Sequence, residues 1–398
     1  MDYNFSDRLR NLEGNAIREI FKMLSQPDMI SFAGGFPAVE TLPHDDIKKI
    51  TADILTPPRC YEILQYGDSS GYLPLRKTAV NYLKRYGLEG LEVGNITVVS
   101  GGQQAIDLTC KAFLNKGDNV LVEEPTYLAV LHILKTYEAN AYGVKSGDDG
   151  IDVADLEAKI IKYQPKFIYL VPTFSNPTGK TLSIQKRKQI AELTAKYKVL
   201  VIEDDPYSEL RFEGDRIPAM KSFDKCGNII FISSFSKTIS PGFRISLCVA
   251  DKQISAKLEL GKQATDVHTS SLSQAIVNEY LNRGLMDVNL VKMIPYYRNK
   301  KETMLAAIKK YMPKEFKYTD PKGGLFIWGN LEADIDTGAL FPEVAALKVA
   351  YVPGVSFYAD GKTKNAIRLN FSKATNEDID KGIRILGNFF KGKLLGAK

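Results

Sequence analysis

Apolar runs rich in Val, Ile and Phe alternate, between residues 96 and 250, with segments whose apolar residues recur every three or four positions. Such runs are typical of strands buried on both faces of a parallel sheet, and the intervening segments are typical of amphipathic helices. The alternation predicts an α/β fold, with a mostly parallel sheet, right-handed crossovers and helices on both faces. The expected strands are residues 96–100, 120–123, 141–144, 167–171, 199–203, 228–233 and 245–250, and the expected helices are 73–86, 101–114, 153–163, 184–197 and one that starts at 125–127.

The pattern changes after residue 250. Helical spacing predominates first, and short apolar strands follow, which predicts a smaller α+β unit behind a long linking helix. The expected helices are residues 252–263, 271–282, 290–311 and 377–390, and the expected strands are 316–318, 323–328, 349–354 and 367–371. Near the start of the chain, residues 11–25 also carry apolar residues at helical spacing.

Composition narrows the class of protein. A chain of 398 residues with 44% hydrophobic and 25% charged residues is typical of a globular protein with a substantial core. The net charge of +6 is spread without a basic block, so nucleic acid is not an expected partner. The basic clusters Lys186-Arg187-Lys188 and Lys300-Lys301 fall in helical patterns, and we expect them to face solvent.

The cysteines and histidines give no pattern for a metal site. The four cysteines are scattered and form no CxxC pair, which fits a reducing compartment, and the three histidines are isolated. The N-terminus is too polar for a signal peptide, and no apolar run reaches the ~18 residues of a membrane helix. We therefore expect a cytoplasmic protein without metal and without a membrane partner.

Lys237 is the first candidate for chemistry. It follows the apolar run that starts at residue 228, and so lies just past the carboxyl end of a strand, where open α/β sheets bind ligands. A lysine there could hold a carbonyl cofactor as a Schiff base if burial lowers its pKa. Arg244, after a Pro-Gly turn, could bind a phosphate. Taken alone, the same stretch is more often a surface loop with an ordinary lysine.

Other polar residues end neighbouring strands. Asn176 follows one strand, Asp204 and Tyr207 follow another, and Lys237 follows a third, so all should meet at one edge of the sheet. The glycine pair at 101–102 opens a helix, an arrangement that binds phosphate through free N–H groups or serves only as a turn.

Two arginines are open to two interpretations each. Arg368 lies on an apolar strand, where an unpaired guanidinium would be costly, so its partner is either an ion pair within the protein or an anionic substrate. Arg18 would ordinarily be a solvated charge on the helical segment 11–25. The nearby pair Gly34-Gly35 could let the backbone approach a ligand or form a plain tight turn.

Together these stretches resemble the fold-type I, pyridoxal phosphate-dependent aminotransferases of class I and II. The closest likeness is to the branch of 2-aminoadipate, kynurenine and aromatic aminotransferases. The matching stretches, in the family's order, are residues 30–37, 65–76, 100–104, 123–127, 171–179, 203–207, 233–244 and 367–372. The resemblance implies a homodimer with active sites at the subunit interface. It also implies a three-layer αβα large domain with a mostly parallel seven-stranded sheet over residues 46–290, a small α+β domain over 291–398, and an N-terminal arm, 1–45, that contributes to the small domain and the substrate pocket.

The resemblance also implies a role for each site residue. Lys237 would carry pyridoxal 5'-phosphate as a Schiff base, and Asp204 would pair with the ring nitrogen. The D-x-x-Y register and strand alternation favour Asp204 over Asp205. Tyr207, Asn176 and Tyr127 would contact the ring, and the phosphate would be bound by Gly102, Gln103, Ser234, Ser236, Arg244 and the partner subunit's Tyr66. Arg368 would bind the substrate α-carboxylate in a bidentate fork, with Asn176 also beside the substrate. Gly35 and Arg18 would lie near the substrate side chain. One departure is Gly102, where many relatives carry Ser.

The implied activity is transamination from an L-amino acid to a 2-oxo acid such as 2-oxoglutarate, with ping-pong kinetics. Arg18 could bind a distal carboxylate, as in 2-aminoadipate, or swing aside for an aromatic ring among Tyr72, Phe36 and Phe357; we expect broad tolerance. The same scaffold also runs C–S β-lyase and decarboxylase reactions. A transcription regulator is disfavoured because only about 30 residues precede Gly34, and a non-catalytic phosphate-binding protein is disfavoured by the full residue set.

Overall fold

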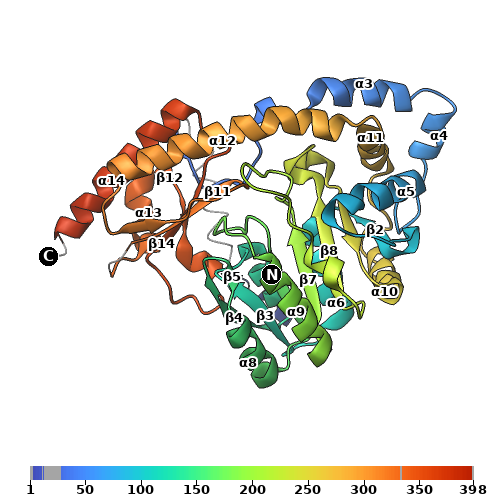
Figure 1. Ribbon diagram of the computed structural model, residues 1–398, viewed down its shortest axis with the longest axis horizontal. Coiled ribbons are helices and arrows are strands. Elements are labelled where there is room, and N and C mark those ends of the chain that lie inside the picture. The colour runs from blue at the N-terminus through green and yellow to red at the C-terminus, as the bar shows by residue number, and fades with distance from the viewer. Residues whose placement is uncertain (1–2, 11, 13–27, 332–333, 397–398) are drawn as a thin grey trace.

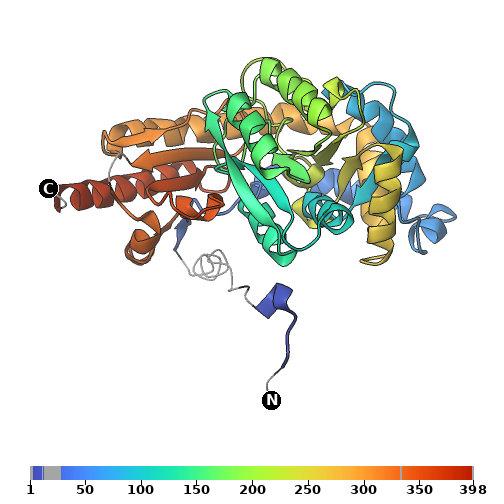
Figure 2. The same ribbon diagram turned by 90° about the horizontal axis from the view of Figure 1, so that it is seen from below.

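The computed structural model describes residues 3–10, 12, 28–331 and 334–396 (Figures 1 and 2). The helix expected over residues 11–25, which includes Arg18, therefore falls almost wholly outside the described residues. Within the described ranges, no helix combines the length and the apolar character needed to cross a bilayer.

The larger sheet has the strand order β2-β9-β8-β7-β6-β3-β4-β5. The five strands from β8 to β4 are parallel, and β9 lies antiparallel between β2 and β8. The seven strands expected from the sequence are all present, and the two-residue β5 adds to one edge by antiparallel pairing. The bounds are β2 (Ile96–Val99), β3 (Asn119–Glu124), β4 (Asn140–Gly147), β5 (Gly150–Ile151), β6 (Phe167–Leu170), β7 (Leu200–Asp205), β8 (Ile229–Ser234) and β9 (Ser246–Val249).

Helices cover both faces of this sheet. Leu121 and Ile168 belong to a core cluster that includes residues of α8 and α9, whereas their neighbours Val122 and Tyr169 belong to a second cluster that includes residues of α6 and α7. Because successive side chains of a strand point to opposite faces, the two clusters are the two interlayer cores of an αβα fold. The helices are α3 (His44–Ile54), α4 (Arg59–Ile63), α5 (Leu73–Tyr82), α6 (Gly102–Phe113), α7 (Leu128–Thr136), α8 (Val153–Tyr163), α9 (Ile184–Tyr197), α10 (Lys252–Gln263) and α11 (Ser271–Asn282), with α1 (Asp7–Arg10) at the start of the chain.

A second, antiparallel sheet lies at the other end of the molecule, in the order β10-β11-β14-β13 (Figure 1). Beside it, β1 pairs in parallel with β12, and the Phe32 backbone bonds to Ala350 and Asn370. The long helix α12 runs along both parts of the molecule. The bounds are β1 (Ile30–Ser31), α12 (Leu285–Tyr311), β10 (Phe316–Tyr318), β11 (Phe326–Leu331), α13 (Thr337–Ala346), β12 (Val349–Ala350), β13 (Val352–Pro353), β14 (Ala366–Asn370) and α14 (Asn376–Gly396).

The expectation that the two basic clusters face solvent is wrong for three of their residues. Arg187 is 1% exposed, because helix α9 turns it towards the loops at the strand ends, where its guanidinium donates to three backbone carbonyls. Lys301 is also buried and pairs with Glu213 and Asp320, and Lys300 donates to the Ala374 carbonyl. Helical spacing alone does not show which charged residue meets such a set of acceptors.

Candidate active site

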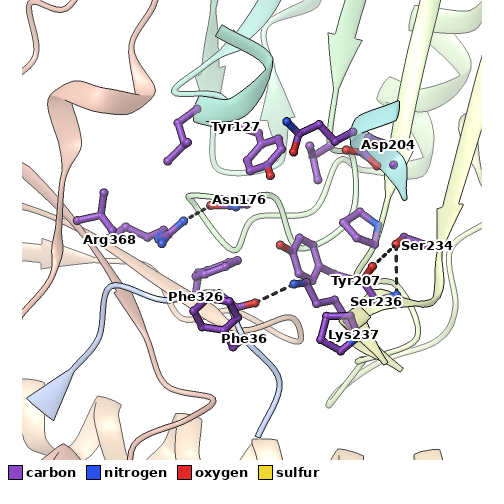
Figure 3. Close-up of a pocket in the computed structure, with 18 of the residues that line it drawn as sticks. Phe36, Tyr127, Asn176, Asp204, Tyr207, Ser234, Ser236, Lys237, Phe326 and Arg368 are labelled. Atoms are coloured by element: carbon purple, nitrogen blue, oxygen red, sulfur yellow. Dashed lines mark hydrogen bonds between the residues drawn. The ribbon is translucent and has the colours of Figure 1, made fainter. Parts of the chain in front are cut away.

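A cavity of about 330 Å³ lies at the carboxyl ends of the parallel strands, between the two sheets (Figure 3). All the predicted site residues that the structure describes, except Tyr66, line it, although they come from segments far apart in the chain. They are Gly35, Gly102, Gln103, Tyr127, Asn176, Asp204, Tyr207, Ser234, Ser236, Lys237, Arg244 and Arg368.

Lys237 ends a short 3₁₀ turn (Phe235–Lys237) that directly follows β8. Its Nζ donates to the carbonyl oxygen of Gly35 at 2.8 Å. Burial, followed by the positive charges of Arg244 and Arg368, lowers the pKa of Lys237 to about 8. About a tenth of this lysine is therefore an uncharged amine at pH 7, far more than for an ordinary lysine, and this is the form that reacts with a carbonyl group.

Asp204 and Asp205 end strand β7 and have different surroundings. The Asp204 carboxylate accepts a hydrogen bond from the Tyr169 hydroxyl at 2.7 Å and lines the cavity, whereas Asp205 accepts from the backbone and hydroxyl of Ser208. Burial raises the pKa of Asp204 to about 7; the bond from Tyr169 opposes this rise and the charge of Asp205 adds to it. Of the two, Asp204 is the carboxyl group available to a cationic ligand atom.

Arg368 reaches the cavity from β14 of the second sheet. Its Nη1 donates to Asn176 Oδ1 at 2.9 Å, and its Nη2 donates to the carbonyl of Ala33. The guanidinium lies 4.5 Å from the ring centre of Phe326 and 5.2 Å from that of Phe357. Its Nε is buried and has no hydrogen-bond partner among the residues that the structure describes, and burial lowers the pKa of the group to about 10. An incoming carboxylate would supply the missing acceptor.

Hydrogen-bond donors gather at the other end of the cavity. Gly101 has φ of +90°, a backbone conformation that favours glycine, and a Cβ there would also displace the Arg244 guanidinium at the start of α6. Ser234 and Ser236 bring two hydroxyls, whose oxygens lie 3.2 Å apart. The first N–H groups of a helix, two hydroxyls and an arginine form a suitable cradle for a phosphate.

Aromatic and aliphatic side chains complete the lining. Tyr207 meets Phe326 edge-on, with ring centres 5.7 Å apart, and burial raises the pKa of both Tyr127 and Tyr207, so both phenols remain protonated donors. Phe326 is not among the residues predicted from the sequence, although the preceding Gly323-Gly324 pair marks its loop. The other apolar lining residues include Phe36, Leu128, Val171 and Val352.

Among the described residues, the predicted site residue Tyr66 does not line the cavity. Tyr66 is 84% exposed, and its ring meets that of His268 edge-on at 6.0 Å. Arg18 lies outside the described residues. Of the three apolar walls considered for the substrate, only Phe36 lines the cavity; Phe357 packs beneath Arg368, and the backbone N–H of Tyr72 bonds to Gln274.

The donor set fits the cofactor that the sequence resemblance implies. An amine with a lowered pKa, a buried carboxyl group without a cationic partner and a cradle of phosphate-binding groups lie around one cavity. Each is left short of a partner that pyridoxal phosphate could supply, through its aldehyde, its ring nitrogen and its phosphate.

Comparison with known proteins agrees with this geometry. The model of the family "Aminotransferase class I and II" matches residues 27–386. Aromatic-amino-acid aminotransferase 1 of Thermococcus litoralis is 38% identical, over 99% of this chain and 96% of that protein. The 2-aminoadipate transaminase of Thermus thermophilus is 35% identical, over 96% and 95%. The crystal structure of Pyrococcus horikoshii kynurenine aminotransferase in complex with PMP, the amine form of the cofactor, superimposes with a TM-score of 0.94 at 37% identity, over 98% and 97% of the two chains. The chain thus belongs to the class I and II aminotransferases, and is a transaminase whose cofactor is pyridoxal 5'-phosphate.

Proposed function

We propose that the enzyme moves the amino group of an aromatic or 2-aminoadipate-like L-amino acid to a 2-oxo acid such as 2-oxoglutarate, in two half-reactions of ping-pong type. Lys237 is the lysine that carries the cofactor. The observation that supports this best is the meeting of three groups in one cavity: the Lys237 amine, the Asp204 carboxyl group and the incompletely bonded Arg368. The names of the relatives, which cover aromatic amino acids, 2-aminoadipate and kynurenine, support a broad donor range.

When bound, the cofactor supplies an electron sink that makes the α-proton of the amino acid removable. Asp204 pairs with the ring nitrogen and keeps it protonated. Once the incoming amino group has displaced it from the cofactor, the freed Lys237 Nζ would take the α-proton and later return it on the cofactor side, a task suited to an amine with a pKa of about 8. Tyr207 and Asn176 bind the 3-oxygen of the ring, and Tyr127 stacks on the ring face.

The two ends of the cavity hold the two anionic groups. Gly102, Gln103, Ser234, Ser236 and Arg244 hold the phosphate, through backbone N–H groups, hydroxyls and a guanidinium.

Arg368 grips the α-carboxylate of the substrate, so that its Nε gains an acceptor. The substrate side chain then lies among the aromatic and aliphatic walls, which include the phenylalanines Phe36 and Phe326. An aromatic side chain matches these walls directly, whereas the distal carboxylate of 2-aminoadipate needs a cation, the role proposed for Arg18 beside Gly35.

Absorbance titration of the holoenzyme with single amino acids, without an oxo acid, tests the proposal. A true donor converts the aldehyde form of the cofactor to the amine form in one turnover and releases one equivalent of 2-oxo acid. Release of a thiol or of CO₂ in place of the 2-oxo acid would instead identify a lyase or a decarboxylase. An Arg18→Ala variant should lose activity towards 2-aminoadipate and retain it towards phenylalanine if Arg18 binds the distal carboxylate.

We also propose a homodimer in which Tyr66 of each subunit reaches the phosphate of the other. The exposure of Tyr66, together with that of Tyr61 and Leu64 nearby, supports this, because a large ring left in solvent beside apolar neighbours is typical of an interface. Mixing Lys237→Ala and Tyr66→Ala subunits tests it: a mixed dimer holds one intact site only if Tyr66 acts across the interface. Activity above that of both parents supports the proposal, and no gain after verified subunit exchange contradicts it.

A further inference from the structure

We propose that Lys262 and Asp266 are positioning residues for the cofactor phosphate, because they fix the loop before α6 from the side away from the cavity. This inference rests on the proposed phosphate site at Gly102 and Gln103. Neither Lys262 nor Asp266 lines the cavity, and both lie beyond the strand-end motifs that direct the chemistry.

Ser100 is the point at which this support acts. Its backbone N–H donates to Gln104 Oε1 at 2.7 Å, and its hydroxyl donates to Asp266 Oδ2 at 2.8 Å. Its carbonyl oxygen lies 3.4 Å from Arg244 Nη2. The residue is thus held at three atoms, directly before the glycine turn that aims the first N–H groups of α6 into the cavity.

Lys262 holds the two side chains that hold Ser100. Its ammonium donates to Gln104 Oε1 at 2.9 Å and to the two Asp266 oxygens at 2.8 and 2.9 Å, and Gln104 Nε2 also donates to Asp266 at 2.8 Å. Lys262 is 0% exposed, and all three of its donor positions are used. Burial works against the charge of Asp266, yet the bonds from Lys262, Gln104 and Ser100 together lower its pKa.

A closed hydrogen-bond network of this kind is more rigid than isolated contacts, because each side chain restricts the conformations open to the next. Helix α10, which carries Lys262, is thereby tied to the start of α6. Without the Lys262 ammonium, Gln104 and Asp266 lose their shared donor, and the hydrogen bonds that they form with Ser100 are no longer held in one geometry. The expected defect is a looser phosphate cradle, with the ring and substrate contacts left in place.

Titration of the apoenzyme with pyridoxal phosphate and with pyridoxal, which lacks the phosphate, measures this defect without assaying activity. In Lys262→Met the dissociation constant for pyridoxal phosphate should rise about tenfold, the equivalent of losing one good positioning bond, while that for pyridoxal changes less than about twofold. Ser100→Ala, a milder change that should fold, should give about a threefold rise with the same preference.

Two controls make the result specific. Lys301→Met removes a lysine that is equally buried and ion-paired but lies in the α12 network, and it should leave both dissociation constants unchanged. Arg244→Gln tests the phosphate site itself and should weaken pyridoxal phosphate alone. If Arg244→Gln weakens pyridoxal phosphate but Lys262→Met and Ser100→Ala do not, or if they weaken both ligands equally, the inference is wrong and the proposed site stands. If Arg244→Gln also binds normally, the phosphate site is wrong, and the inference falls with it.

Discussion

Two buried arginines show how the cavity differs from the rest of the protein. Arg187, a buried residue of α9, has a partner for each of its three guanidinium nitrogens, namely the carbonyls of Leu182, Pro218 and Pro172. Its Nη1 also lies 3.8 Å from Glu203 Oε1. Arg368, 5% exposed in the cavity, keeps Nε without a partner, and none of the described carboxylates forms an ion pair with it.

The contrast extends to other charges. Lys301 pairs with Glu213 and Asp320, and Asp205 accepts from Ser208. Within the described part of the chain, Lys237 donates to one carbonyl and Asp204 accepts from one phenol. Leaving a buried charge short of partners costs stability, and proteins keep such groups where a ligand completes them. The scaffold charges therefore support the fold, and the cavity charges support binding and chemistry. Replacing matched members of the two sets tests this division.

The largest effect is expected at the two lysines. Lys237→Ala should reduce transamination at least ~10⁴-fold, because Lys237 is the only lysine among the described residues that line the cavity and its amine carries both the cofactor and the proton. The unfolding temperature of the apoenzyme should stay level or rise, since an incompletely bonded charge is removed. Lys301→Met should show the opposite pattern, with near-normal turnover and a lower unfolding temperature. Appreciable turnover by Lys237→Ala would refute the assignment.

The next largest difference is expected between substitutions of the two adjacent aspartates. Asp204→Asn should lower kcat by ~10²–10³-fold, because a neutral amide does not stabilise a protonated ring nitrogen. Asp205→Asn should instead destabilise the turn at Ser208 and leave kcat within a few-fold of the wild type. Steady-state kinetics and thermal unfolding of both variants decide the matter; equal kcat losses would contradict the choice of Asp204.

The arginines come third. Arg368→Met should raise KM for the amino donor by ~10²-fold through loss of the carboxylate fork, with little change in stability. Arg187→Met should cost ~3–5 kcal/mol of unfolding free energy, because Glu203 is left buried, and should leave KM unchanged. If both variants lost stability and neither changed KM, Arg368 would be a structural residue like Arg187 and not a substrate-binding one.

The smallest effect concerns pH. With a pKa of about 8, lowered by burial and then by Arg244 and Arg368, Lys237 gains its uncharged form as pH rises. The rate at which the apoenzyme takes up pyridoxal phosphate should therefore rise about tenfold from pH 7 to 9 and level off above the pKa. A lysine with an ordinary pKa would give a steeper rise without a plateau. In Arg368→Met the midpoint should move upward, since one of the lowering charges is gone.

The sequence predicted strand ends well and side-chain partners poorly. Alternation along β7 predicted that Asp204 and Asp205 point to opposite sides, because it depends only on local geometry, and the D-x-x-Y register of the resemblance favoured Asp204. The Tyr169–Asp204 bond was not foreseeable, since it requires the order and register of two neighbouring strands, which the residues of either strand do not encode. The burial of Arg187 was missed for the same reason: its acceptors are backbone carbonyls from distant loops. The role of Phe326 depends on how the second sheet approaches the first.

The segment that follows β1 crosses the cavity with its carbonyls turned to the two key cations: Ala33 accepts from Arg368 and Gly35 accepts from Lys237. Peptide oxygens cannot be removed by exchanging side chains. Sequence drift at positions 33 and 35 can therefore change the shape of the pocket, and with it the preferred substrate, without stripping either cation of its resting acceptor. A shift in backbone register, such as a one-residue insertion or deletion before Gly34, is the kind of change that would do so. In a lineage that diversifies its substrates, this segment should therefore accumulate replacements more often than length changes.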